Sequence, residues 1–123
     1  GAYVLADPEG EPDVVLIGTG SEVAVALDAA ATLTAAGHSV RVVSMPCTEL
    51  FAEQADGYRA SVLPAGIPTV SVEAGVTFGW ARWADTSIGI DRFGASAPGD
   101  QAMTGLGITP AAVVAAAESL LGT

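Results

Sequence analysis

The chain has 123 residues, of which 50% are apolar and 15% charged, and this size and balance indicate one globular domain rather than two domains or a disordered segment. Its formal net charge of −10 comes from 14 acidic residues against four arginines and no lysine. Because nucleic acids and anionic membranes are bound through Lys and Arg, this charge excludes both as expected partners.

The first half of the chain alternates apolar runs with one helical pattern. Tyr3–Leu5 is a short apolar run, and Val14–Ile17 is a continuous aliphatic run typical of a strand buried on both faces. Thr19 and Glu22 form a Thr-x-x-Glu capping box, which predicts a helix start, and Gly37 suits the end of that helix. The predicted core face of the helix consists of Val23, Leu27, Ala30 and Leu33.

The same alternation continues to the end of the chain. We expect further strands at Val40–Val43, Thr69–Val72 and Ser87–Ile90, and helices from Thr48 through Phe51, across Asp56–Val62 and across Thr77–Ala84. The chain turns helical again from Ala97, and Thr109-Pro110 predicts the start of a closing helix whose core face is Val113, Val114, Ala117, Leu120 and Leu121. Strands separated by helices predict an α/β fold with a mostly parallel sheet covered on both faces.

The turn Gly18–Glu22 follows a predicted strand and opens a helix, which is also where phosphate-binding loops lie. Gly18 and Gly20 match the start of a dinucleotide-binding fingerprint, but Val23 stands where the third glycine belongs. Glu22 moreover brings a carboxylate into the first helical turn, where a phosphate would lie. We interpret the turn as a tight strand-to-helix connection, with a small-anion site as the alternative.

Two further residues are candidate site residues, each with a structural alternative. Glu73 ends a predicted buried strand, at the edge of the sheet where open α/β folds bind ligands, and is either a general base or the cap of the next helix. Arg92 opens the loop Arg92–Pro98; its guanidinium suits a carboxylate or phosphate, and the amides near Ser96 suit an anion. The alternative interpretation is that this loop forms an interdomain contact.

Nucleophilic catalysis and metal binding find little support in the sequence. His38, the only histidine, follows the helix-ending glycine and is expected at the surface, and Cys47, the only cysteine, is expected to pack against its neighbours. A solvated loop, rather than a weak cation site, is expected for the alternating acids Asp7, Glu9, Glu11 and Asp13. A single cysteine favours a reducing cytoplasm, and no apolar run approaches the about 20 residues of a membrane span.

Several short motifs occur in order along the whole chain. The most specific are Val43–Pro46 (VSMP), Val72–Gly75 (VEAG) and Phe93–Pro98 (FGASAP). Weaker ones accompany them, such as Gly18–Ser21 (GTGS) and Gly107–Thr109 (GIT). Together these motifs resemble the carboxy-terminal domain of the thiamine-diphosphate-dependent transketolase family, and the resemblance covers the chain without a large gap.

The resemblance implies a three-layer α/β/α fold with a five-stranded mixed, mostly parallel sheet whose first strand is antiparallel. It also implies that residues 1–123 are one domain of a longer three-domain subunit, in agreement with a chain that opens on Gly1 without Met. The parent enzyme is expected to be a cytoplasmic homodimer of the pentose phosphate pathway. It would transfer a two-carbon ketol unit between sugar phosphates, with thiamine diphosphate and Mg²⁺ as cofactors.

In transketolases the two upstream domains hold cofactor and substrate at the dimer interface, so the resemblance implies no catalytic, cofactor-binding or metal-binding residue in this chain. We therefore predict that the isolated chain is inactive and that its role is structural, through contacts with upstream domains and the dimer mate. The residues expected at such contacts are Phe78, Trp80, Trp83, Arg92, Phe93, Ser96 and Pro98. The alternative is a free-standing module that binds a small anionic ligand at Gly18–Glu22 or at Arg92–Pro98.

Overall fold

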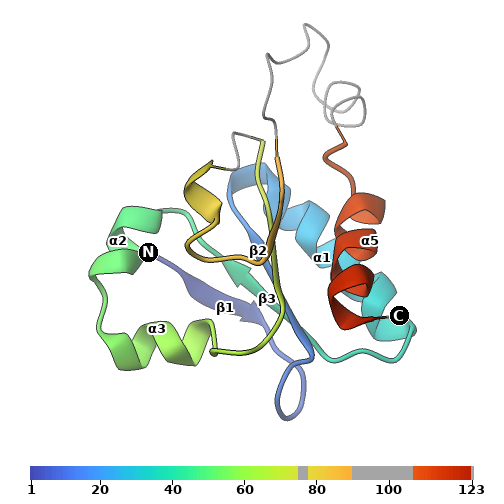
Figure 1. Ribbon diagram of the computed structural model, residues 1–123, viewed down its shortest axis with the longest axis horizontal. Helices are drawn as coiled ribbons and strands as arrows, with labels where there is room; N and C mark the ends of the chain where they lie inside the picture. The colour runs from blue at the N-terminus through green and yellow to red at the C-terminus, as the bar shows by residue number, and fades with distance from the viewer. Residues whose placement is uncertain (75–77, 90–106, 123) are drawn as a thin grey trace, which may run out of the picture.

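The computed structural model describes residues 1–74, 78–89 and 107–122, and in this part of the chain five strands form a single sheet (Figure 1). The strands are β1 (Tyr3–Ala6), β2 (Val14–Gly18), β3 (Val40–Ser44), β4 (Thr69–Val72) and β5 (Thr86–Ile88). They are arranged in the order β1-β3-β2-β4-β5. Only the β1–β3 pair is antiparallel, and the other three pairs are parallel, so the predicted mixed sheet with an antiparallel first strand is confirmed.

Helices cover both faces of the sheet, which gives the predicted three layers. The helices α1 (Val23–Ala35) and α5 (Pro110–Leu121) lie on one face. The other face is covered by α2 (Thr48–Glu53), α3 (Asp56–Val62) and the 3-10 turn η2 (Phe78–Trp80). The helix predicted across Thr77–Ala84 is therefore shorter than expected, while the one predicted from Ala97 lies outside the described residues.

Two hydrophobic cores form, one on each face of the sheet, because successive side chains of a strand point to opposite faces. In β2, Val14 and Leu16 belong to the core under α1 and α5, whereas Val15 and Ile17 belong to the core under α2 and α3. All five residues of β2 are buried, as its continuous aliphatic run predicts for a central strand. β1 is an edge strand and leaves Tyr3 and Leu5 about half exposed.

The boundaries of the long helices follow their capping residues. Gly37 adopts a φ of +99° and, with His38, closes the end of α1: the Gly37 amide donates to Thr34 and the His38 amide to Leu33. At the start of α5 the Thr109 hydroxyl accepts a hydrogen bond from the amide of Ala112 at 3.1 Å, as the Thr-Pro pair predicts. Both boundaries are confirmed.

The predicted core face of α1 is partly wrong. The buried residues are Ala26, Ala29 and Leu33, whereas Leu27 is 39% exposed. This helix is apolar almost all round, so its periodicity does not single out one face, and the position of α5 beside it decides which residues are covered. In α5 the predicted face is confirmed, with Val113 and Ala117 fully buried.

Polar contacts tie distant segments to the sheet. The side chain of Arg41, in β3, donates from Nε to Asp7 at 2.8 Å and from Nη1 to the carbonyls of Ser61 and Val62 at 2.8 and 3.1 Å. It therefore joins the loop after β1 to the end of α3. The hydroxyl of Tyr58 donates to the carbonyl of Ala2 at 2.6 Å, which fixes the first residues beside α3.

Candidate functional site

The turn at the carboxyl end of β2 is tightly closed. Gly18 ends the strand, and a Cβ atom there would lie 2.8 Å from the Cα atom of Val23, which is closer than any real Cβ contact. Gly20 has a φ of +58°, a value that favours glycine. One 3-10 turn, η1 (Gly20–Glu22), separates the strand from α1. The tight strand-to-helix connection is thus present where the sequence predicts it.

Glu22 does not form the predicted capping box. Thr19 makes no side-chain hydrogen bond at this helix start, and the Glu22 carboxylate reaches across to the neighbouring strand instead. Its Oε1 atom accepts a hydrogen bond of 2.7 Å from the backbone amide of Ala74, directly beyond β4, and Oε2 accepts one from the hydroxyl of Ser21. The side chain is buried, with only 6% of its surface exposed. The buried carboxylate of Glu22 therefore lies beside this turn, where its negative charge would disfavour an anionic ligand.

The structure brings two of the predicted site segments together at this edge of the sheet. Glu73 follows β4, beside the Ala74 amide that Glu22 binds, and its own backbone amide donates to the carbonyl of Ile88 at 3.1 Å. Its side chain is half-buried. Both segments lie at the carboxyl ends of parallel strands, where open α/β sheets place ligands. A role for Glu73 as a general base stays a prediction.

Two of the aromatic residues predicted for interdomain contacts, Trp80 and Trp83, lie at the core beneath α2 and α3. Trp80 is only 4% exposed and belongs to that core, so little of its ring is available to another domain. Trp83 is half-buried; its ring meets Phe51 edge-on at a centroid distance of 5.1 Å, and the guanidinium of Arg82 stacks on it at 4.5 Å. Phe78 begins η2. An interdomain role for these residues stays a prediction.

The loop Arg92–Pro98, with Arg92, Phe93, Ser96 and Pro98, lies outside the described residues. The predictions made for this loop, as an anion site or as a contact with another domain, therefore remain predictions.

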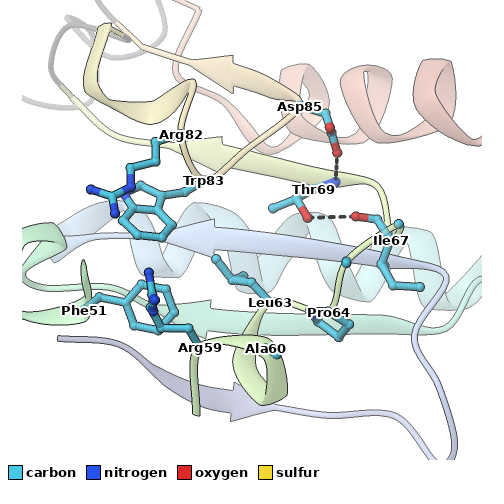
Figure 2. Close-up of a pocket in the computed structure, with 12 residues that line it drawn as sticks. Phe51, Arg59, Ala60, Leu63, Pro64, Ile67, Thr69, Arg82, Trp83 and Asp85 are labelled. Carbon is cyan, nitrogen blue, oxygen red and sulfur yellow. Dashed lines mark hydrogen bonds between the residues drawn. The ribbon is translucent and has the colours of Figure 1, made fainter. Parts of the chain in front are cut away.

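A groove that the sequence did not reveal lies between α3 and the segment Arg82–Asp85 (Figure 2). We name it the α3 groove; its volume is about 310 Å³, and its lining includes Phe51, Arg59, Leu63, Pro64, Ile67, Thr69, Arg82, Trp83 and Asp85. Figure 2 shows Arg59, Arg82, Phe51 and Trp83 gathered at one end, and Asp85, Thr69 and Ile67 at the other.

The polar groups of the α3 groove differ between its two ends. At one end the carboxylate of Asp85 accepts a hydrogen bond from the amide of Thr69 at 2.8 Å. At the other end Arg59 forms an ion pair with Asp56, and its Nε atom is buried without a hydrogen-bond partner among the described residues. One end of the groove is therefore acidic and already hydrogen-bonded, and the other carries two guanidinium groups.

Several residues considered as metal ligands or nucleophiles take part in hydrogen bonds with other groups of the chain. Asp7 pairs with Arg41, and the carboxylate of Asp13 accepts from the amide of Ser39 at 2.8 Å. Cys47 donates to Glu49 at 3.4 Å. In the described ranges no group of three or more His, Cys, Asp or Glu residues is placed to hold a metal ion. No helix in those ranges combines the length and apolar character that crossing a membrane requires.

Comparison with known proteins gives consistent matches over the whole chain. The family profile for a transketolase-like TK C-terminal domain matches residues 1–109. The chain is 52% identical over 128 residues to transketolase 7 of Craterostigma plantagineum, covering 98% of this chain and 19% of that protein. It is 49% identical over 126 residues to the chloroplastic transketolase of Solanum tuberosum, covering 98% and 17% respectively.

A solved structure gives the same result in three dimensions. Transketolase from Leishmania mexicana matches with a TM-score of 0.94 at 47% identity, over 99% of this chain and 18% of that chain. The sequence thus spans about a fifth of the length of the proteins that it matches.

Proposed function

Because this chain belongs to the transketolase family and corresponds to its carboxy-terminal domain, we propose that it is one domain of a longer, three-domain enzyme. That enzyme transfers a two-carbon ketol unit between sugar phosphates in the pentose phosphate pathway. The matches cover nearly all of this chain but about a fifth of each relative, which supports a role as one part of a larger subunit. They do not favour the alternative of a free-standing anion-binding module.

Within that enzyme the role proposed for the domain is architectural. The observation that carries this proposal is the hydrogen bond between the Glu22 carboxylate and the Ala74 amide. It fills, with a group of the chain itself, the edge of the sheet where open α/β folds bind ligands. A domain whose sheet edge is closed in this way fits a structural role beside neighbouring domains better than a catalytic role of its own.

The described residues do not fit thiamine diphosphate or Mg²⁺. Magnesium takes oxygen ligands from carboxylates and phosphates, and the described ranges hold no cluster of three such side chains. The strand-to-helix turn that suits a diphosphate by its position already holds the buried carboxylate of Glu22, which would repel it. Cofactor, metal and catalytic groups are therefore assigned, within this proposal, to the upstream domains and the dimer mate.

The partners proposed for the domain are the upstream domains of its own subunit and the second subunit of a homodimer. Exposed apolar side chains on two separate elements support such contacts: Tyr3 and Leu5 on the edge strand β1 are 50% and 44% exposed, and Leu50 on α2 is 56% exposed. The contacts predicted at Trp83 and at the Arg92 loop are proposed to involve the same partners. The proposed compartment is the cytoplasm, although two relatives are named as chloroplastic.

Calorimetric titration of the 123-residue chain tests the architectural role. We expect no saturable heat when thiamine diphosphate and Mg²⁺ are added together, because the described residues offer no site for them. The same cofactors should give saturable heat with the intact parent enzyme. Saturable binding by the isolated chain would overturn the assignment, and Glu73 and Arg92 would be the first residues to substitute.

A second experiment tests the contacts proposed at β1. Leu5→Lys should reduce self-association and hydrophobic-dye binding of the isolated chain, because it replaces an exposed apolar group on β1. Thr32→Lys makes the same charge change at an exposed polar position of α1 and serves as the matched control. Equal behaviour of the two variants, measured by sedimentation, would argue against β1 as part of such contacts.

A further inference from the structure

We propose that the α3 groove is a binding site for a small phosphate monoester with a compact apolar body. This site is separate from the carboxyl edge of the sheet that Glu22 closes, since the residues of the turn do not line the groove. The inference goes beyond the proposed architectural role and does not depend on the family assignment.

The distribution of positive charge is the first support for this site. The chain has four cationic side chains and a net charge of −10, yet two of the four, Arg59 and Arg82, line one groove of about 310 Å³. Arg41, by contrast, is used in structural hydrogen bonds. A concave surface with concentrated positive charge attracts anions locally even on an acidic protein.

Each of the two guanidinium groups has one side-chain contact in the described part of the chain, and Arg82 is otherwise exposed. Arg82 stacks on the ring of Trp83 at 4.5 Å and forms no ion pair with a described residue. Arg59 is bonded to Asp56, but Asp56 is 94% exposed, so water screens this pair and the guanidinium keeps much of its attraction for a second anion. Its buried Nε atom has no partner among the described residues.

Two guanidinium groups at one end of the groove favour a phosphate monoester over a carboxylate. A guanidinium donates several N–H groups in a planar fork that matches phosphate oxygens, and a dianion is attracted by both groups at once. Asp85 lies at the opposite end of the groove, where its carboxylate repels an anion. The phosphate is therefore expected between Arg59 and Arg82, with the rest of the molecule directed towards Asp85.

The remaining walls define the body of the ligand. Leu63, Pro64 and Ile67 give the groove an apolar side, and its volume is at the lower end of the range of about 300 to 1,000 Å³ typical of small-molecule sites. The space suits one ring or a short chain. A nucleotide or a larger cofactor would extend beyond it.

Phenyl phosphate is a suitable probe, and two-dimensional NMR of the 123-residue chain gives a residue-specific measurement. We expect saturable shifts of the indole signal of Trp83, which lines the groove, and smaller shifts for Trp80, which is buried in the core and does not. Phenol, which lacks the phosphate, should cause no saturable shift. Absence of saturation by phenyl phosphate up to about 10 mM, which corresponds to negligible affinity, would overturn the proposal.

Two variants locate the phosphate. Arg82→Gln and Arg59→Gln should each weaken binding of phenyl phosphate by about tenfold, the effect of losing one charge-assisted hydrogen bond. Thr32→Glu, on α1 at the other face of the sheet, makes the same change of net charge away from the groove and should leave the affinity within about twofold. Equal affinity of Arg82→Gln, Arg59→Gln and the unchanged chain would overturn the assignment to this groove.

Failure here is distinguishable from failure of the architectural role. The titration with thiamine diphosphate and Mg²⁺ reports on cofactor binding, whereas phenyl phosphate without metal reports on the α3 groove. A negative result with phenyl phosphate therefore leaves the family assignment and the architectural role unchanged.

Discussion

The carboxylate of Glu22 and the backbone amide of Ala74, which are 52 positions apart in the chain, form a 2.7 Å hydrogen bond that joins the ends of β2 and β4. Glu22→Ala would leave that amide without its acceptor in a partly buried setting. We expect a loss of about 1–3 kcal/mol in the free energy of unfolding, measured by urea denaturation.

Two further variants show whether the carboxyl group itself is responsible. Glu22→Gln retains an oxygen acceptor and should cost less than Glu22→Ala. Glu53→Ala removes an exposed carboxylate and should change stability by less than about 0.5 kcal/mol. If Glu22→Ala were as mild as Glu53→Ala, the hydrogen bond would not contribute to closing this edge of the sheet.

Gly18 and Gly57 form a matched pair for alanine substitution. At Gly18 the added Cβ would lie 2.8 Å from the Cα atom of Val23, and because backbone cannot give way cheaply we expect a loss of about 1–3 kcal/mol. At Gly57, inside α3, nothing lies within 4 Å, so alanine should stabilise the chain by about 0.4–1 kcal/mol. Thermal denaturation measures both changes in stability. If both variants were stabilised or both destabilised, the result would contradict the packing described for the turn.

Substitution of Arg41 should cost more stability than substitution of its partner Asp7. Arg41→Ala removes the ion pair with Asp7 and two hydrogen bonds to the end of α3, from a side chain that is only 12% exposed. Asp7→Asn removes only the charge on the half-exposed side. We expect about 1–3 kcal/mol for the first change and less than about 1 kcal/mol for the second. A double-mutant cycle measures both losses of stability. Similar losses for the two single variants would show that the carbonyl contacts contribute little.

The pKa of Glu49 is lowered, first by a hydrogen bond from its own backbone amide at the start of α2 and then by the Cys47 side chain. A carboxyl group whose pKa is depressed by folding contributes stability above its unfolded pKa. That contribution disappears as the pH falls through the folded value. Cys47→Ala should raise the pKa of Glu49 by removing the second donor, as measured by NMR titration. An unchanged Glu49 would show that the thiol is not a donor.

The elements of the fold were predictable because their signals are local. The strand Thr69–Val72 and the helix Asp56–Val62 have the predicted boundaries, since continuous aliphatic runs and flanking prolines determine them. The cap of α5 at Thr109 and the end of α1 at Gly37 were equally predictable from the sequence. These features depend on residues only a few positions apart.

The candidate site was less predictable because its contacts are distant in sequence. A capping box and a cross-strand hydrogen bond both use Glu22, and only the position of Ala74 decides between them. The α3 groove likewise combines Arg59 with Arg82 and Trp83, from segments that no spacing rule connects. The face of α1 was ambiguous for a related reason, because α5 arrives from the other end of the chain.

The central position of β2 has a consequence for local motion. Its backbone is hydrogen-bonded to β3 on one side and to β4 on the other, and its side chains anchor a core on each face. Fraying of β1 or β5 leaves these bonds intact, so the amide protons of Val15 and Ile17 should exchange with deuterium only when the whole domain opens. Amide protons of the edge strands should exchange orders of magnitude faster. Among the strands, β2 should therefore show the slowest amide exchange.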